Sequence, residues 1–423
     1  AVSVAEGATA VGDYDATDAD TDTDATSGSC TDGGTDAALF TPSTVDGNTC
    51  RIAFSSAPNY EDAGDSGGNN VYDVTLIATD AGSNSDTMTL TVTVTDGNDN
   101  APEYDDADDA VAVSVAEGST AVGSYDLSDA DTDTTATAGG CSDSGDDAAI
   151  FTPTTTDGDT CTIAFTSAPN YESAGDTGSN NIYNVNLVAS DGVATDTLVL
   201  TITITDANDN APEWDDADDA VAVSVNEGGT TVGSYDATDA DTLTTATAGG
   251  CSDSGTDAAD FTPSTTDGNT CTIAFSSATD FENPADDGTN NIYNVNLVVS
   301  DGVATDTLAL TITVVNTNDE APEWNDADDA VAVTVNEGAT AVGAYDVTDA
   351  DTSDLFNDIS TCTDSGDDAA IFTPTKTDED TCTIAFAAAE DYESPDDTGA
   401  NNIYNVNLIA TDAGSNADTL VLT

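Results

Sequence analysis

The stretch DANDNAPEW at residues 206–214 indicates how the whole chain is organised, because it occurs in three versions at a regular interval. DGNDNAPEY occupies residues 96–104, and NTNDEAPEW occupies residues 316–324. Each version follows a segment in which apolar residues alternate with threonine or other residues, such as residues 198–204. Carboxylates and amides closed by a proline suit a hard cation such as calcium, which takes roughly six to eight oxygen ligands. One copy is equally typical of an acidic turn before a strand, whereas three copies in register favour a calcium site at each of three domain junctions.

The composition is dominated by acidic residues. The chain has 83 Asp and Glu, only two basic residues (Arg51 and Lys376) and no histidine, for a net charge of −81. This charge excludes nucleic acid as a partner, because phosphate binding requires Lys and Arg, and it disfavours an anionic membrane surface. Leu, Ile, Val and Phe make up about 17% of residues, which with high net charge is typical of disorder. The alternation of apolar residues predicts folded domains instead, so cations and disulfides are candidates for additional stabilisation.

The eight cysteines form four pairs whose members are 20 residues apart. The pairs are Cys30 and Cys50, Cys141 and Cys161, Cys251 and Cys271, and Cys362 and Cys382. An even count at constant spacing predicts one disulfide within each repeat and an oxidising, extracellular setting. The alternatives are a zinc site, for which the chain has no Cys-x-x-Cys motif and no histidine, and free buried thiols. Closing a loop of this size adds roughly 3 kcal/mol in the chain-entropy model.

A Val-x-Glu-Gly motif recurs at Glu6, Glu117, Glu227 and Glu337, which gives a repeat of 110 or 111 residues. This period matches one immunoglobulin-sized sandwich of about 100 residues. The sequence therefore predicts an all-β fold of four tandem immunoglobulin-like Greek-key β-sandwich domains, each of about seven strands, in an extended rod. The predicted domains are residues 1–104, 105–214, 215–324 and 325–423, the last with a truncated final strand.

The second repeat shows the strand pattern most fully. We predict strands at residues 111–115, 121–125, 160–165, 183–187 and 198–204, and a weak strand at 149–152 before Pro153. Around residues 139–143 we predict mostly loop, with one short strand as the alternative. The period of two places Cys161, Ile163 and Phe165 on the core side of their strand.

The two ends of the sequence do not coincide with the ends of a repeat. Residue 1 corresponds to Ala112, and Thr423 corresponds to Thr201. We expect the sequence to be part of a longer tandem array; the alternative is that a neighbouring subunit completes the last strand, as in donor-strand complementation. No run of about 18 apolar residues predicts a membrane span.

Taken together, these motifs resemble the repeats of the calcium-dependent cadherin superfamily over the whole chain, in the style of a prokaryotic-type surface repeat protein. The linker is similar to the family motif D-x-N-D-N-A-P. The resemblance implies ligands from the glutamate after the first strand, a D-x-E motif, the linker, and a D-x-D motif and a late aspartate of the following repeat. It also implies about three Ca²⁺ ions per junction, and several ions are electrostatically reasonable because so many carboxylates would otherwise repel one another.

The resemblance assigns ligands at each junction. The first would use Glu6, Glu61, Asp96, Asn98, Asp99, Asn100, Asp129, Asp131 and Asp191. The second would use Glu117, Glu172, Asp206, Asn208, Asp209, Asn210, Asp239, Asp241 and Asp301. The third would use Glu227, Asp280, Glu282, Asn318, Asp319, Asp349, Asp351 and Asp412.

Some positions depart from the family pattern. Asn59 and Asn170 replace the first aspartate of D-x-E, which weakens the outermost site at the first two junctions. Asn316 and Glu320 replace linker residues at the third junction. The Asp-rich segment 215–219 is outside the family motif, and we interpret it as a solvated acidic turn in preference to a further cation site.

Trp214 and Trp324 lie in linkers and not at an N-terminus, so we do not expect adhesion by exchange of a tryptophan-anchored strand. We expect both to pack across a junction. No enzyme is predicted, because the chain lacks histidine, has one lysine, and repeats near-identical units without one asymmetric site.

The expected function is therefore structural. We expect an extracellular or cell-surface protein that forms a calcium-rigidified rod or fibre and self-associates into a surface filament or matrix, through β edges, outer Thr and Asn faces or cation bridges. The alternatives are the stalk of a calcium-dependent adhesin and an acidic calcium-storing or mineral-binding matrix protein. Thr and Ser runs such as residues 242–245 could carry O-linked glycans.

Overall fold

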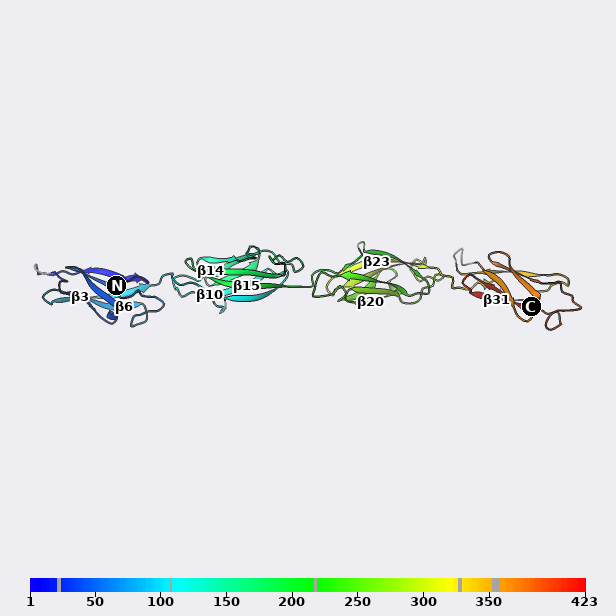
Figure 1. The fold of residues 1–423 in the computed structure, drawn as a ribbon, viewed down its shortest axis with the longest axis horizontal. Helices are drawn as coiled ribbons and strands as arrows, with labels where there is room; N and C mark the ends of the chain where they lie inside the picture. Colours follow the sequence, from blue (N-terminus) through cyan, green and yellow to red (C-terminus); the bar gives the residue numbers. More distant parts are fainter. Residues whose placement is uncertain (21–23, 107–108, 217–218, 326–328, 352–357) are drawn as a thin grey trace. The chain divides into compact units, whose positions relative to one another are not determined.

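The computed structural model describes residues 1–20, 24–106, 109–216, 219–325, 329–351 and 358–423 (Figure 1). In this part of the chain all the longer elements are strands, which form eight sheets, two for each of four domains. The predicted all-β fold of four sandwich domains is confirmed. Residues 1–207, with domains 1 and 2, and residues 208–423, with domains 3 and 4, form two compact units that are described separately.

The elements recur in the same order along the chain. Domain 1 has β1 (Val2–Ala5), β2 (Ala10–Asp15), β3 (Ser29–Gly33), the 3-10 helix η1 (Ala37–Leu39), β4 (Phe40–Asp46), β5 (Thr49–Phe54), β6 (Val71–Thr79) and β7 (Ser85–Thr95). Domain 2 has β8 (Glu103–Tyr104), β9 (Ala110–Ala116), β10 (Ala121–Ser128), β11 (Gly140–Ser144), η2 (Ala148–Ile150), β12 (Phe151–Asp157), β13 (Thr160–Phe165), β14 (Ile182–Ser190) and β15 (Thr195–Thr205).

The second unit repeats this order. Domain 3 has β16 (Glu213–Trp214), β17 (Ala220–Asn226), β18 (Thr231–Thr238), β19 (Gly250–Ser254), η3 (Ala258–Asp260), β20 (Phe261–Asp267), β21 (Thr270–Phe275), β22 (Ile292–Ser300) and β23 (Thr305–Val315). Domain 4 has β24 (Glu323–Trp324), β25 (Ala330–Val331), β26 (Ala341–Thr348), β27 (Thr361–Ser365), η4 (Ala369–Ile371), β28 (Phe372–Lys376), β29 (Thr381–Phe386), β30 (Val406–Thr411) and β31 (Ala417–Leu422).

Each domain is a sandwich of two sheets. In domain 2, sheet I has the order β11-β14-β15-β9, and sheet II has the order β12-β13-β10-β8. β9 pairs with β15 in parallel, whereas the other pairings are antiparallel. The chain passes from one sheet to the other after β8, β9, β10, β11 and β13, which is the Greek-key arrangement. Sheets I and II have corresponding orders in domains 3 and 4, and sheet II of domain 1 has the three strands β2-β5-β4.

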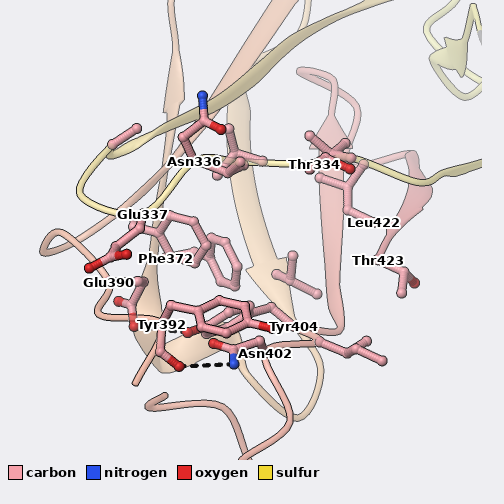
Figure 2. A pocket seen from close by; sticks show the side chains of 17 residues that line it. Thr334, Asn336, Glu337, Phe372, Glu390, Tyr392, Asn402, Tyr404, Leu422 and Thr423 are labelled. Carbon is pink, nitrogen blue, oxygen red and sulfur yellow. Dashed lines mark hydrogen bonds between the residues drawn. The ribbon is translucent and has the colours of Figure 1, made fainter. Parts of the chain in front are cut away.

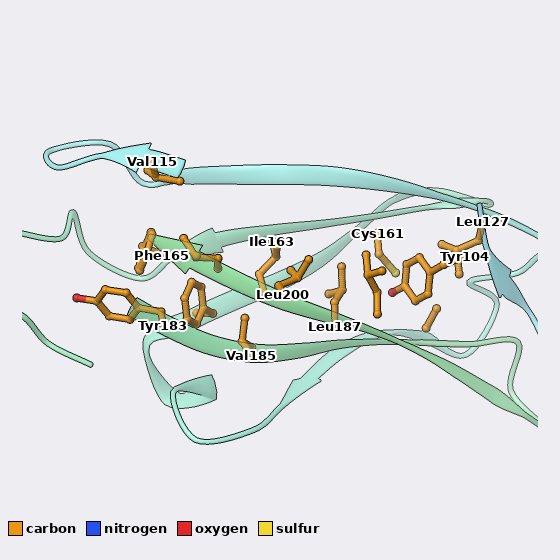
Figure 3. Packing of buried hydrophobic residues seen from close by; sticks show 14 of the residues in the cluster. Tyr104, Val115, Leu127, Cys161, Ile163, Phe165, Tyr183, Val185, Leu187 and Leu200 are labelled. Atoms are coloured by element: carbon orange, nitrogen blue, oxygen red, sulfur yellow. The ribbon is translucent and has the colours of Figure 1, made fainter. Parts of the chain in front are cut away.

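The core of domain 2 lies between the two sheets (Figure 3). The predicted inward residues of β13 are buried, with Cys161 and Ile163 at 0% exposure and Phe165 at 5%. They face Tyr183 on β14 and Leu200 on β15, and the rings of Phe165 and Tyr183 meet edge to face at 5.2 Å. Burying a side chain of this size contributes about 1.5–3 kcal/mol, so the alternating pattern directly supplies the packing between the sheets.

Disulfides join the two sheets in every domain. Cys141 on β11 is bonded to Cys161 on β13, with their Cα atoms 5.8 Å apart. The other three bonds pair the cysteines as predicted: Cys30–Cys50, Cys251–Cys271 and Cys362–Cys382. Each links a strand of sheet I with one of sheet II, so the bond reinforces a small apolar core at the point where the sheets face each other.

The aromatic residue that closes each linker motif packs into the domain that follows it. Trp214 is 3% exposed in the core of domain 3, and its strand β16 pairs with β18. Tyr104 and Trp324 have the same place in domains 2 and 4. The prediction that the tryptophans pack across a junction is therefore wrong, because the short strand turns each ring into the next core. We propose that the domain boundaries lie just before β8, β16 and β24.

One local prediction in domain 2 needs correction, and a second is narrowed to one of its alternatives. The weak strand at residues 149–152 is instead η2 followed by β12, which continues through Pro153 to Asp157. β12 is the edge strand of sheet II, so the missing N–H of proline costs no sheet hydrogen bond on its free side. In the segment around residues 139–143, the alternative of one short strand holds: this strand is β11, which pairs with β14.

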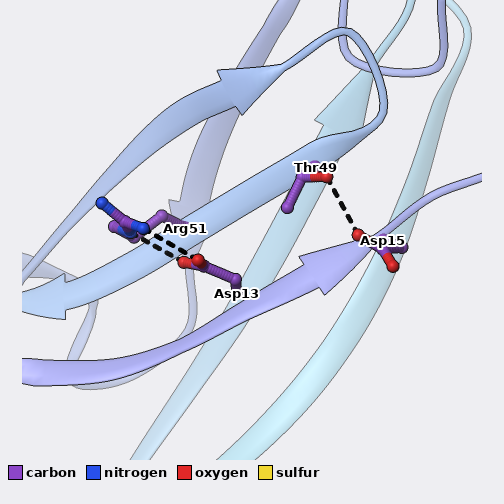
Figure 4. A network of polar contacts seen from close by, with 4 residues as sticks. All are labelled: Asp13, Asp15, Thr49 and Arg51. Atoms are coloured by element: carbon purple, nitrogen blue, oxygen red, sulfur yellow. Dashed lines mark hydrogen bonds and ion pairs between the residues drawn. The ribbon is translucent and has the colours of Figure 1, made fainter.

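The outer face of sheet II carries a different side-chain pair at the place of Arg51 in domain 1 and in domain 2. In domain 1, Arg51 forms an exposed ion pair with Asp13, its Nε donating to Oδ1 at 2.7 Å (Figure 4). In domain 2, Thr162 occupies the corresponding place and shares a hydrogen bond with Ser124 at 2.8 Å. Exposed ion pairs contribute little to stability, so either pairing suits this face.

Candidate metal centres

A glutamate after the first strand fastens each linker to its own domain. Glu117, which is 7% exposed, accepts hydrogen bonds from the backbone N–H groups of Tyr171 at 2.8 Å and Ala207 at 2.6 Å. Glu6 and Glu227 accept equivalent bonds in domains 1 and 3. One carboxylate thus holds both the loop with the D-x-E motif and the start of the linker beside the end of the sandwich.

Acidic side chains of domains 1 and 2 gather at the first junction. Within each group, one carboxylate oxygen per residue lies within 4.8 Å of the others, and the groups are Glu6, Glu61 and Asp96; Glu61, Asp99 and Asp131; and Asp129, Asp131 and Asp191. Glu61 and Asp131 each belong to two groups, so the clusters form one continuous series. The linker takes part through Asn100, whose N and Nδ2 donate to the two Asp131 carboxylate oxygens at 3.1 and 2.7 Å.

Several of these carboxylates are buried with one oxygen unsatisfied. Asp191 is 3% exposed, and its Oδ1 accepts from the N–H groups of Val193 and Ala194 at 2.7 and 2.6 Å. Its Oδ2 is buried and has no hydrogen-bond partner among the described residues, and the same holds for Oδ1 of Asp96 and Oδ2 of Asp129. Burial without a partner is costly for a charged oxygen, so these atoms fit a cation.

A glycine positions the loop that carries Asp191. A Cβ atom on Gly139 would lie 2.6 Å from both the Gly192 nitrogen and the Ser190 Oγ, which no side chain could accept without displacement. Gly249 has the same close contact in domain 3. The sequence analysis assigned Gly139 to a loop only, because the contact that requires glycine joins segments about 50 residues apart.

The third junction holds a cluster of four carboxylates. Oxygens of Glu227, Glu282, Asp319 and Asp351 lie within 4.8 Å of one another. Asp351 is 0% exposed, and both of its carboxylate oxygens are buried without a hydrogen-bond partner in the described part of the chain. Four acidic groups so close together, one of them fully buried, repel one another unless a cation lies between them.

The electrostatics of this cluster appear in its pKa values. Burial, followed by the charge of Asp349, raises the pKa of Asp351 to about 6. Burial, with added repulsion from Glu227 and Asp351, raises the pKa of Glu282 to about 7. Without a cation, part of the repulsion is relieved by protonation close to neutral pH, so a divalent ion would offset an energetic cost that the fold itself creates.

Other predicted ligands of the third junction lie around this cluster. Asp412 is 2% exposed and accepts from the backbone N–H of Asn416 at 2.8 Å. Asn416 also donates through Nδ2 to Asn318 Oδ1 at 3.0 Å, which links the linker to domain 4. The sequence analysis did not identify Asn416, although its position shortly after the late aspartate was a usable signal. Asn316, which replaces the leading aspartate, donates to Glu282 Oε1 at 3.0 Å.

Two predicted residues of the third junction are less enclosed. Burial, followed by the charges of Glu227 and of the exposed Asp280, raises the pKa of Asp319. Asp349 has a buried Oδ2 without a partner among the described residues, while its Oδ1 accepts from the Asp351 N–H at 3.0 Å.

The ligands predicted for the second junction are divided between the two units. In the first unit, oxygens of Glu117, Glu172 and Asp206 lie within 4.8 Å of one another. In the second unit, Asn210 donates through N and Nδ2 to Asp241 at 3.0 and 2.7 Å. Each half reproduces its counterpart at the first junction.

The remaining residues of that half also follow the first junction. Asp241 is 2% exposed, and its N–H donates to Asp239 Oδ1 at 3.0 Å. Asn208 donates to the Asp301 backbone oxygen at 3.4 Å, as Asn98 does to that of Asp191 at 3.3 Å. Asp209 is exposed, as Asp99 is.

The asparagines that replace the first aspartate of the D-x-E motif accept backbone hydrogen bonds within their own turns. Asn59 accepts from the Glu61 N–H at 3.0 Å, and Asn170 accepts from the Ser173 N–H at 2.6 Å. Asp280 accepts from Asn283 in the same manner at 2.8 Å. The substitution keeps the turn but removes one negative charge.

In the acidic segment 215–219, residues 217 and 218 lie outside the described residues.

The donor set defines the kind of metal. The clusters offer carboxylate and amide oxygens, the chain has no histidine, and all eight cysteines are in disulfides. Zinc and copper sites are built from nitrogen and sulfur ligands, whereas oxygen ligands suit calcium and other hard cations. The residues present therefore fit calcium.

A cavity of about 380 Å³ opens at one end of domain 4 (Figure 2). Phe372, Tyr404 and Leu422 line it, and Tyr404 donates to Glu390 at 3.0 Å. In domain 2, Ile202 on β15 fills the corresponding space, since it pairs with Tyr183, the counterpart of Tyr404.

No family model matches the chain, and no curated protein matches it in sequence. Solved structures match along its whole length. The protocadherin gamma B4 extracellular domain aligns with a TM-score of 0.56 and 20% identity, over 100% of this chain and 64% of that one. A four-repeat fragment (EC1-4) of PcdhgB3 aligns with a TM-score of 0.59 and 18% identity, over 100% and 98%.

Protocadherin gamma B2 extracellular cadherin domains 1–5 align with a TM-score of 0.53 and 18% identity, over 100% of this chain and 77% of that one. The chain thus spans just under two thirds of the protocadherin gamma B4 structure. These similarities establish the fold as tandem cadherin-like repeats. In the described residues, no helix is long and apolar enough to span a membrane.

Proposed function

We propose that this chain is a non-enzymatic, extracellular structural protein whose cadherin-like domains are joined by calcium into a stiff rod. The rod self-associates into a surface filament or matrix. The predicted ligands at each junction hold about three Ca²⁺ ions. These ions fix the angle between neighbouring domains, which the short linkers do not fix by themselves.

The single observation that carries this proposal is the four-carboxylate cluster at the third junction. Asp351 is fully buried beside Glu227, Glu282 and Asp319, and among the described residues neither of its carboxylate oxygens has a hydrogen-bond partner. A solvated acidic turn would leave such carboxylates in water, where each is hydrated and repulsion is screened. A fold that buries them together supports a resident divalent cation as their partner.

The extracellular location is supported by two features of the chain. Four disulfides are stable only in an oxidising compartment. Free Ca²⁺ is plentiful outside cells, where modules with dissociation constants of roughly 10⁻⁴–10⁻³ M are occupied. A second candidate function is the stalk of a calcium-dependent adhesin. The similarity to extracellular domains of protocadherins favours it equally, since a stalk and a filament subunit share the same repeats.

Small-angle scattering of the full chain tests the calcium rod directly. We expect the maximum dimension and the thermal midpoint both to be higher in calcium than in EDTA, because ligands that bind only the native state stabilise it by RT ln(1 + [L]/Kd). Magnesium at equal ionic strength controls for general screening. Equal dimensions and equal midpoints in calcium and EDTA would show that the acidic linkers are solvated turns.

The second junction gives a site-specific version of the test. We expect Glu117, Glu172 and Asp206 to share calcium with Asp209 and Asp241. Among single substitutions at the second junction, Asp209→Ala should therefore loosen the junction most. Direct titration with calcium should show fewer bound ions in Asp209→Ala, and unchanged stoichiometry would contradict its role as a ligand.

A further inference from the structure

The outward face of sheet I carries no charged residue in domains 2 and 3. In domain 2, every second residue of β9, β11, β14 and β15 points outward, and these positions hold only Gly, Ala, Ser, Thr, Asn, Val and Ile. The central row runs from Asn184 through Thr201 to Ala112 in register. In domain 3 the equivalent row runs from Asn294 through Thr311 to Ala222. We call this surface the neutral face.

The absence of charge is unusual for this chain, in which 83 residues are acidic. In domains 2 and 3 the strands of sheet I do contain aspartates, but at inward positions. Asp143 on β11 points inward, and its Oδ2 is buried without a hydrogen-bond partner in the described residues. Asp32, Asp253 and Asp364 repeat this arrangement in the other domains. In domains 2 and 3, β11 and β19 thus keep an unfavourable inward carboxylate while the outward positions of sheet I stay neutral.

The neutral face also concentrates exposed apolar side chains. In the described residues, twelve large hydrophobic side chains are exposed. Four of them lie on the neutral face: Ile182 at 39%, Val199 at 44%, Ile292 at 40% and Val315 at 40%. Val421, at 43%, has the same outward place on β31 of domain 4. Apolar groups gathered on one flat surface typically mark a contact with another macromolecule.

We propose that the neutral face is the surface through which two copies of this chain associate, with sheet I of one copy packed against sheet I of the other. A basic partner would bind the acidic remainder of the surface and not this face. A second copy presents the same small side chains, and Thr and Asn both donate and accept hydrogen bonds, so the face is complementary to itself. Two sheets pack face to face at about 10 Å when their side chains are small and neutral.

This interface predicts an unusual response to salt. Two copies, each with a net charge of −81, repel one another at low ionic strength. Salt screens this repulsion, since the Debye length falls from about 10 Å at 0.1 M to about 3 Å at 1 M. The neutral face itself contains no ion pair that salt would weaken. Association should therefore become stronger as NaCl is raised.

The test places a carboxylate in the centre of the neutral face. Val199→Asp combined with Ala309→Asp does so in domains 2 and 3, and Val199→Thr with Ala309→Thr is the uncharged control. Thr154→Asp combined with Ser264→Asp adds the same charge on the outer side of sheet II. If the first pair fails to fold, Ser114→Asp with Ser224→Asp charges the same face on β9 and β17.

Sedimentation velocity of the full chain in calcium, over a series of protein concentrations and NaCl concentrations, gives the association constant. We expect wild type and the threonine control to associate, and the charged neutral-face variants to associate at least tenfold more weakly. The sheet II variant should match wild type. A monomeric wild type at all concentrations, or equal effects of the two charged faces, would overturn the proposal.

The inference deepens the self-association in the proposed function, but its test is separate from that of calcium. The neutral face has no ligand of the metal clusters. If calcium leaves the thermal midpoint of the monomer unchanged while the neutral-face variants still lose association, the calcium rod fails and this interface stands. If calcium stabilises the monomer but the variants associate like wild type, the calcium rod stands and this interface fails.

Discussion

Replacing Asp351 by Asn should change stability in opposite directions with and without calcium. In the metal-free protein, Asp351 lies within 4.8 Å of three other carboxylates, measured between ligand oxygens. Two unit charges at that distance repel by about 3 kcal/mol at an effective dielectric constant of about 20. Protonation near neutral pH already relieves part of this, because the pKa of Asp351 is about 6 and that of Glu282 is about 7. We therefore expect Asp351→Asn to stabilise the metal-free domain by about 1–3 kcal/mol.

With calcium, the same substitution should be destabilising relative to wild type. Asparagine keeps one ligand oxygen but loses the charge. Calcium at a concentration of about 100 Kd adds about 2.7 kcal/mol to wild type, and each tenfold weakening of Kd removes about 1.4 kcal/mol of that gain. The two unfolding curves should therefore change order when EDTA replaces calcium.

Tryptophan fluorescence can follow domain 4 alone in this experiment. The chain has two tryptophans, and Trp324 is buried in the core of domain 4. In a Trp214→Phe background, denaturant unfolding reports Trp324 only, which avoids treating four domains as one transition. Asp367→Asn, at an exposed position of domain 4, is the matched control for loss of one charge. If Asp351→Asn lowers the midpoint in EDTA and leaves the calcium-induced shift unchanged, Asp351 is a structural hydrogen-bonding residue and not a calcium ligand.

Three further predictions follow from the packing. Gly139→Ala should lower calcium affinity at the first junction, because the added Cβ would displace the loop that holds Asp191. Titration with calcium measures this affinity. The control is Gly175→Ala, where the nearest atom to the added Cβ is the Tyr183 hydroxyl at 3.6 Å, an ordinary van der Waals contact. Asp147→Ala should destabilise domain 2 by roughly 1–3 kcal/mol, because backbone N–H groups lose their acceptor. Burial raises the pKa of Asp147, but the N–H donors outweigh burial and lower it, so the stabilisation by this carboxylate is present above about pH 4 and is lost as pH falls further. The measurement compares the unfolding free energies of wild type and mutant between pH 3 and 7. A difference that persists at the lowest pH would contradict the prediction. Replacing both Cys141 and Cys161 by Ser should cost domain 2 roughly 3 kcal/mol, measured by denaturant unfolding; an equal midpoint would mean that the sheets need no covalent link.

The fold was predictable where burial follows the period of two. β13, β14 and β15 satisfy this rule along their whole length, so their inward residues, including Cys161, could be assigned from the sequence. β16 could not, because a strand of two residues has no period, and Trp214 in an acidic linker has no local signal for the core that it joins. η2 and the passage of β12 through Pro153 depend on the edge position of that strand, which is a tertiary property.

The metal clusters were predictable in residue type but not in geometry. Oxygen-bearing residues at strand ends identified the candidates. The separation between Asp129 and Asp191, which come from different loops, is fixed only by the pairing of the strands that carry those loops. Gly139 and Asn416 escaped for the same reason, since each acts through a contact with a distant segment.

The distribution of charge explains how a chain with so few large apolar residues holds its shape. The apolar residues are concentrated between the sheets, where Cys141–Cys161 and its counterparts add a covalent link. The outward side of sheet I carries no charge in domains 2 and 3. Buried carboxylates lie at the domain ends, where the burial of Asp191 and Asp351 carries a cost that a cation would offset. Because the same residues belong to the domain and to the junction, loss of that cation should weaken the domain end and free the linker in one step. Stability of a domain and stiffness of the chain are therefore expected to respond together to calcium, although no apolar contact between domains is required.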